Sequence, residues 1–232
     1  MNQEAALIRE RMKTPRAAAA AGILFSLLLI ASMLLIRSSV SDNPMGSATE
    51  VISHSVRISL ALNMLPFAGI AFLWFIAVMR DRLGELEDRF FATVFLGSGF
   101  LFIAMIFTAA AIAGGIIRVL QSGSANLVQS GAYTLGRIQI FQAMNIYAMK
   151  MAAVFMISTS TISYKSRIVP RWMALLGFVL ALILLLNVGT IQWSLLAFPL
   201  WVLLISGHIL TDNFRGQPKV AAEGTGKRKP FA

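Results

Sequence analysis

The stretch FFATVFLGSGFLFIAMIFTAAAIAGGIIR, residues 90–118, carries no charge before its final arginine. The hydrocarbon core of a bilayer is about 30 Å thick, and a helix of about 20 apolar residues crosses it. The rest of the chain has the same character, because 57% of its residues are hydrophobic and only 13% are charged. A soluble domain could not bury so much apolar surface, so the composition predicts a membrane protein.

Six apolar stretches divide the chain and predict an all-α bundle of six transmembrane helices. They cover residues 17–36, 56–79, 90–118, 138–162, 172–187 and 191–210. The last two are separated only by a short turn, so a five-span alternative is open. The predicted organisation is a basic cytoplasmic segment at 1–16, a transmembrane domain at 17–212 and a disordered basic cytoplasmic tail at 213–232.

The basic residues predict the orientation, because cytoplasmic loops retain Lys and Arg whereas exported loops do not. With a cytoplasmic N-terminus, fifteen of the twenty Lys and Arg residues fall inside. Only Arg37, Arg57, Arg118 and Arg137 fall outside. We therefore predict a multi-pass protein of a bacterial inner membrane with both termini in the cytoplasm. The net charge of +10 then reflects this asymmetry and attraction to anionic membrane lipids, and not nucleic-acid binding.

Lys150 is the remaining basic residue, and it lies midway along the stretch 138–162. A lysine at the centre of a spanning helix costs about 2.5–3.5 kcal/mol, so it is expected to face the bundle interior. No Asp or Glu occurs inside any predicted stretch. Three explanations are open: the amine is neutral because it is desolvated, carbonyl and amide groups hold it, or it binds an anionic ligand. A purely structural role is the competing interpretation.

Polar residues near Lys150 predict a cavity around it. Gln142 and Tyr147 share its face of an ideal helix, and Asn63 lies at about the same depth in the second stretch. Pro66 cannot donate a backbone hydrogen bond, which predicts a local break that turns Asn63 toward the interior.

The outer arginines extend this hypothesis. Arg57, Arg118 and Arg137 lie at the outer ends of three predicted helices and would form a cationic funnel leading to Lys150. The alternative is that these three residues anchor the helices at the membrane interface.

Catalytic and metal-binding patterns are sparse. The chain has no cysteine, which removes thiolate metal sites and disulfides. Ser98 and His208 would be a possible nucleophile and base, but they are expected at different depths in the membrane. We predict no cofactor and no metal site, and the sequence favours a protein that is not an enzyme.

The segment Ser158 to Leu186 carries Ser160, Thr161, Pro170, Arg171, Trp172, Leu176 and Gly177. In these residues the chain resembles a broad group of uncharacterised six-span bacterial membrane proteins, and the likeness extends over residues 10–212. The resemblance implies the six-span topology and no activity. The predicted function is to bind or transport a small anionic or amphipathic ligand at Lys150. The alternatives are an accessory subunit of a larger membrane complex, with a membrane protein as partner, and a membrane enzyme.

Overall fold

The computed structural model describes residues 2–40, 48–83, 89–123, 131–166, 169–187 and 193–215. Its regular structure is entirely helical over these residues, which confirms the predicted all-α class. The predicted tail lies outside this part of the chain, except that residues 213–215 continue the last helix.

The helices of the described residues include five segments of membrane-spanning length. In chain order the elements are α1 (Asn2–Arg37), α2 (Ala48–Ser53), α3 (Ser55–Leu83), α4 (Arg89–Gln121), α6 (Ala132–Phe141), the π-helix η1 (Gln142–Ala148), α7 (Met149–Ser166), α8 (Arg171–Leu186) and α9 (Ser194–Arg215). The long apolar segments are Ala17–Arg37, Ser55–Arg80, Ala92–Gln121, Ala132–Tyr164 and Ser194–Asp212. They coincide with five of the six predicted stretches. The other stretch forms α8, which has 16 residues and is therefore only about 24 Å long.

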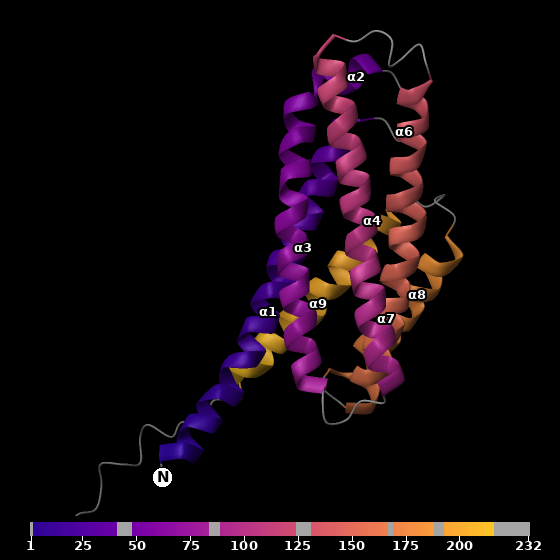
Figure 1. The fold of residues 1–232 in the computed structure, drawn as a ribbon. Helices are drawn as coiled ribbons and strands as arrows, with labels where there is room; N and C mark the ends of the chain where they lie inside the picture. The colour runs from indigo at the N-terminus through magenta and orange to yellow at the C-terminus, as the bar shows by residue number, and fades with distance from the viewer. Residues whose placement is uncertain are drawn as a thin grey trace, which may run out of the picture.

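The long helices pack in a closed order around the bundle. α1 lies against α3 and α9, α4 lies between α3 and α7, and α8 packs on α7 and touches α9. Figure 1 shows the N-terminus of α1 at the same end as the junctions of α3 with α4 and of α7 with α8, which we call the proximal end. The opposite, distal end holds α2, the end of α4 and the start of α6. α8 and α9 meet well short of it.

The span Ala132–Tyr164 is interrupted by the π-helix η1, whose backbone bonds run from i to i+5 instead of i to i+4. The Asn145 side chain adds a bond within this segment, because its Nδ2 donates to the carbonyl of Phe141 at 3.1 Å. The wider turn of η1 rotates the residues of α6 relative to those of α7. An ideal period of 3.6 residues therefore does not hold across this span.

Seven phenylalanines fill the centre of the bundle on the proximal side. They are Phe25, Phe72, Phe75, Phe95, Phe102, Phe155 and Phe198, all at most 2% exposed. Neighbouring rings lie at 4.4–6.3 Å between centroids, the range in which tilted and edge-to-face pairs attract each other. Because five helices contribute to this cluster, it joins α1, α3, α4, α7 and α9 into one packed core.

Two glycines allow the helices to approach closely. A Cβ on Gly22 would overlap Ser206 Oγ of α9 and lie 2.8 Å from the ring of Phe75. A Cβ on Gly177 would overlap Ser160 Oγ of α7 and lie 2.9 Å from the Trp201 ring. Both positions therefore depend on the missing side chain. Close backbone approach of this kind is how helices associate where lipid supplies no hydrophobic drive.

Candidate functional site

The structure does not bring the predicted lysine site together. Asn63 and Gln142 are exposed, Tyr147 is 57% exposed and Lys150 is half-buried. None of these four residues lines the large cavity described below. This cavity is therefore not the one predicted around Lys150 with Asn63, Gln142 and Tyr147. Whether Lys150 binds a ligand elsewhere stays a prediction.

The reason lies in which side of each helix is packed. On α3 the interior stripe contains Leu65, Ala68 and Phe72, all at most 2% exposed, and Asn63 lies two residues, or about 200°, from Leu65. Ala148 and Ala152 of the following span are fully buried, and Lys150 between them is likewise about 200° away. Small and aromatic side chains select the inward face here, so the polar residues turn outward. Pro66 is also exposed, and α3 continues through it as a helix.

The predicted cationic funnel is only partly formed. Arg57 and Arg118 are exposed and do not line the cavity, whereas Arg137 is half-buried and lines it. The other arginine that lines the cavity is Arg37, the last residue of α1. It is one of the four arginines predicted to lie outside, and no site role was predicted for it.

The distal half of the bundle encloses a cavity of about 350 Å³. This volume lies within the range of small-molecule binding sites, about 300–1,000 Å³. The lining comes from α1 and the residues after it (Met33, Leu34, Ile36, Arg37, Val40), α2 (Val51), α3 (Ile58, Leu62, Leu65), α4 (Ala109, Ala110, Ala113, Ile116, Ile117), α6 and η1 (Arg137, Ile140, Phe141, Met144, Asn145) and α9 (Leu195, Leu196).

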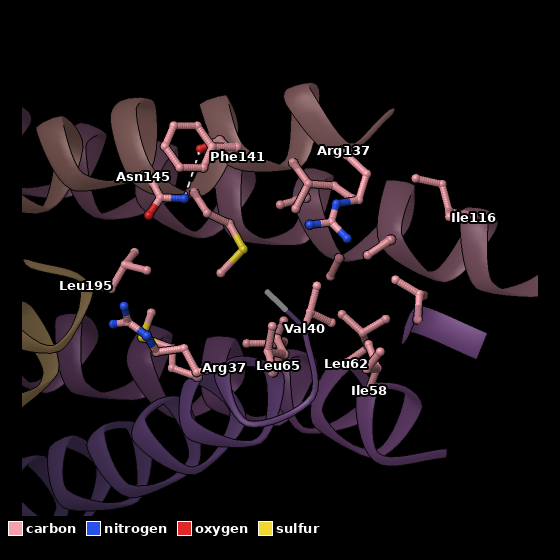
Figure 2. A pocket seen from close by; sticks show the side chains of 18 of the residues that line it. Arg37, Val40, Ile58, Leu62, Leu65, Ile116, Arg137, Phe141, Asn145 and Leu195 are labelled. Atoms are coloured by element: carbon pink, nitrogen blue, oxygen red, sulfur yellow. Dashed lines mark hydrogen bonds between the residues drawn. The ribbon is translucent and has the colours of Figure 1, made fainter. Parts of the chain in front are cut away.

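Three polar side chains stand in this apolar wall. Figure 2 shows the Arg137 guanidinium turned toward the middle of the cavity, whereas the Arg37 guanidinium lies at its edge near Leu195. Asn145 enters from η1 and is held by its bond to Phe141. None of the lining residues that the structure describes is acidic. The described wall of the cavity is therefore mainly apolar, with two basic side chains and no acidic one.

Aromatic neighbours orient both arginines. The Arg37 guanidinium carbon lies 4.5 Å from the centroid of the Trp193 ring, within the range of a cation–π contact. Arg137 donates to the Tyr133 hydroxyl at 3.3 Å, and its guanidinium carbon lies 5.9 Å from that ring. These contacts hold the two guanidinium groups at the cavity.

The cavity exists because the α4 side chains that border it are short and because α9 begins below the distal end. Ala109, Ala110 and Ala113 present only methyl groups from α4. α9 begins at Ser194, whose hydroxyl accepts a hydrogen bond from Asn187 Nδ2 at 2.8 Å, both side chains being buried. This bond joins the end of α8 to the start of α9 below the distal end. The first turn of α9 thus borders the cavity, with Leu195 and Leu196 in its wall.

Two features bear on the metal and serine patterns considered in the sequence. No group of three or more potential metal ligands occurs among the described residues. The buried Ser98 hydroxyl donates to the carbonyl of Phe95 in its own helix at 3.1 Å, which is a common way to satisfy a serine inside a helix.

Sequence reasoning missed Arg37, Asn145 and the alanine wall. A signal for Arg37 was present, because it is one of only four basic residues on the predicted outer side. No local pattern marked Asn145, since its inward position depends on the π-helix.

The chain was compared with protein-family models, curated proteins and solved structures, and nothing matches in any of the three. The resemblance to six-span bacterial membrane proteins therefore stays a prediction.

Proposed function

We propose that this chain is an integral membrane protein that binds a small amphipathic anion in the distal cavity, as a carrier or receptor for that ligand. One observation carries the proposal: Arg37 and Arg137 line an apolar cavity whose described lining contains no acidic residue. An apolar wall accommodates the hydrophobic part of a ligand, and guanidinium groups bind carboxylates or phosphates through paired hydrogen bonds.

The packing agrees with a binding site that opens on one side. The phenylalanine cluster lies on the proximal side of the cavity and fills the centre of the bundle there. A ligand would therefore enter from the distal end or from the side of the distal half. Transport across the whole membrane would require the phenylalanine cluster to separate.

Binding is tested by titrating an anionic amphiphile into the protein in nanodiscs of zwitterionic lipid. Dodecyl phosphate is a suitable probe, with dodecanol as the uncharged comparison. A ligand at 100 times its Kd stabilises the folded protein by about 2.7 kcal/mol, so thermal unfolding reports binding. Dodecyl phosphate is expected to stabilise the protein, whereas dodecanol is not.

The chain offers matched controls for this experiment. Arg37→Gln and Arg137→Gln each remove a cation from the cavity, whereas Arg57→Gln and Arg118→Gln remove exposed cations outside it. Loss of a charged hydrogen bond costs about 1.5–3 kcal/mol, so each cavity variant is expected to bind about tenfold to a hundredfold more weakly. Equal loss of binding in all four variants would show that only the total charge matters and would reject the site.

The proposal includes the topology in a bacterial inner membrane, with six spans and both termini cytoplasmic. Its support is the distribution of Lys and Arg between the loops. Reporter fusions after residues 123, 166 and 215 test it. The first is expected outside and the other two in the cytoplasm. The reverse result for the first two would overturn the orientation, and an outside location for the third would favour five spans.

A second candidate function, an accessory subunit, is favoured by the outer surface. Asn63 and Gln142 are exposed at positions within apolar helices, and Ala111 and Gly115 form an exposed small-residue strip on α4. Polar and small residues of this kind often lie at contacts between membrane helices. Isolation in native lipid particles tests this candidate, since a stoichiometric partner lost on Asn63→Leu would favour the subunit.

A further inference from the structure

The helices of the bundle differ in length by more than a bilayer allows. At 1.5 Å per residue the apolar segment of α1, 21 residues, is about 32 Å long and that of α9, 19 residues, is about 29 Å long. Both match a hydrocarbon core of about 30 Å. The segment in α4, 30 residues, is about 45 Å long, and the span Ala132–Tyr164, 33 residues, is about 50 Å long.

Tilting does not remove the excess. Spanning helices tilt by up to about 40°, which shortens a 50 Å helix to about 38 Å along the membrane normal. Part of the span Ala132–Tyr164 must therefore lie outside the hydrocarbon. Figure 1 shows that the excess is at the distal end, because α4 and α6 continue well beyond the junction of α8 with α9.

The cavity lies between the shorter apolar segments of α1 and α9 and the longer ones that include α4 and α6. Arg37 at the end of α1 contacts Trp193, which directly precedes α9, and Trp193 is 63% exposed, as tryptophans at a membrane interface are. Leu195 and Leu196 border the cavity from this level, whereas Ile117 and Arg137 belong to the projecting parts of α4 and α6. The cavity thus extends from hydrocarbon depth to headgroup depth.

We infer that the ligand is a single-chain anionic amphiphile that resides in the distal leaflet of the bilayer. This inference rests on the proposed function and names its substrate class. The volume of about 350 Å³ is near the lower limit for ligand sites, which favours one chain over the two chains of a phospholipid. Arg137 lies where the charged group of such a molecule would be.

A ligand from the leaflet also explains why the site carries two cations. A chain that moves from lipid into an apolar cavity gains no hydrophobic free energy, because lipid tails are as apolar as the cavity wall. Selectivity must then come from the anionic group and its contacts with Arg37 and Arg137. A ligand taken from water would instead bind about fourfold more tightly with each added methylene.

Photo-crosslinking in nanodiscs tests the inference. The membrane probe is a long-chain diazirine fatty acid at a few per cent of the lipid, and its comparisons are a diazirine monoacylglycerol and a hexanoate diazirine added in water. Ala113→Phe fills the cavity, and Ala111→Phe on the exposed side of α4 is its matched control. Arg137→Gln serves as a second cavity variant that does not depend on fitting a larger side chain.

The fatty-acid probe is expected to label peptides from Ala109 to Ile117 and from Phe141 to Asn145. Labelling should fall at least fivefold in Ala113→Phe and in Arg137→Gln and persist in Ala111→Phe. Equal labelling by the monoacylglycerol would overturn the selectivity for anions.

The source of the ligand is decided by the water-soluble probe. If hexanoate labels the cavity with the same dependence on Arg137 and the long-chain probe does not, the leaflet origin is wrong and the proposed function stands. If no probe gives labelling that depends on Ala113 and Arg137, both the inference and the proposed function fail.

Discussion

Replacement of Phe72 by alanine is expected to destabilise the bundle by about 3 kcal/mol. The Phe72 ring is fully buried and lies 4.4–5.6 Å from the rings of Phe25, Phe102, Phe155 and Phe198. Each aromatic pair contributes about 0.5–1.5 kcal/mol beyond burial, so these four contacts together give about 2–6 kcal/mol. The substitution also leaves a cavity, and measured costs for Phe→Ala in packed cores are about 3–5 kcal/mol.

The lower part of this range is expected because lipid reduces the hydrophobic contribution, while packing remains. The assay is reversible unfolding in bicelles by increasing amounts of a denaturing detergent, followed by far-UV circular dichroism. Phe67→Ala on the same helix is the control, since Phe67 is 64% exposed and is expected to change stability by less than about 0.5 kcal/mol. If the two variants lose similar stability, the assignment of the inward face of α3 is refuted.

Three further predictions concern other helix contacts and the lysine. Gly22→Val is expected to lower the free energy of unfolding by about 1–3 kcal/mol through overpacking. Gly114→Val should be tolerated, because a Cβ at Gly114 meets nothing within 4 Å. Similar unfolding midpoints for both variants would contradict the close approach of α1 and α9. Asn187→Leu removes the buried bond to Ser194 and is expected to cost about 1–3 kcal/mol in the same assay, and an unchanged midpoint would show that this bond does not hold the α8–α9 junction. Lys150→Met should leave both stability and amphiphile binding within error, because this half-buried side chain does not line the cavity, and loss of binding would mean that the site has been misplaced.

The candidate site shows where sequence reasoning reached its limit. Of the three arginines in the predicted funnel, Arg137 lines the distal cavity. Arg57 and Arg118 are exposed and do not line it, and the funnel itself stays a prediction. The place of an arginine at the outer end of a predicted helix establishes its depth in the membrane. It does not establish the direction in which the side chain points.

The direction of a side chain depends on which face of its helix packs against the rest of the bundle. Lys150 shares a helix face with Gln142 in an ideal helix, and the sequence suggested that this polar face is the interior. In the structure the buried positions of this span belong to small residues such as Ala148 and Ala152. η1 also shifts the register between Gln142 and Lys150, so no fixed angle per residue could relate them.

The sequence by itself determined the helical class and the position of the long apolar helices. In an apolar solvent each helix must satisfy its backbone hydrogen bonds within its own segment, so a local run of apolar residues is sufficient to define it. Only the tertiary structure decided that Arg37, Arg137 and Asn145 meet at one cavity. These residues come from separate elements, and their inward orientation results from the packing of glycine, alanine and phenylalanine contributed by the other helices, which no single segment encodes.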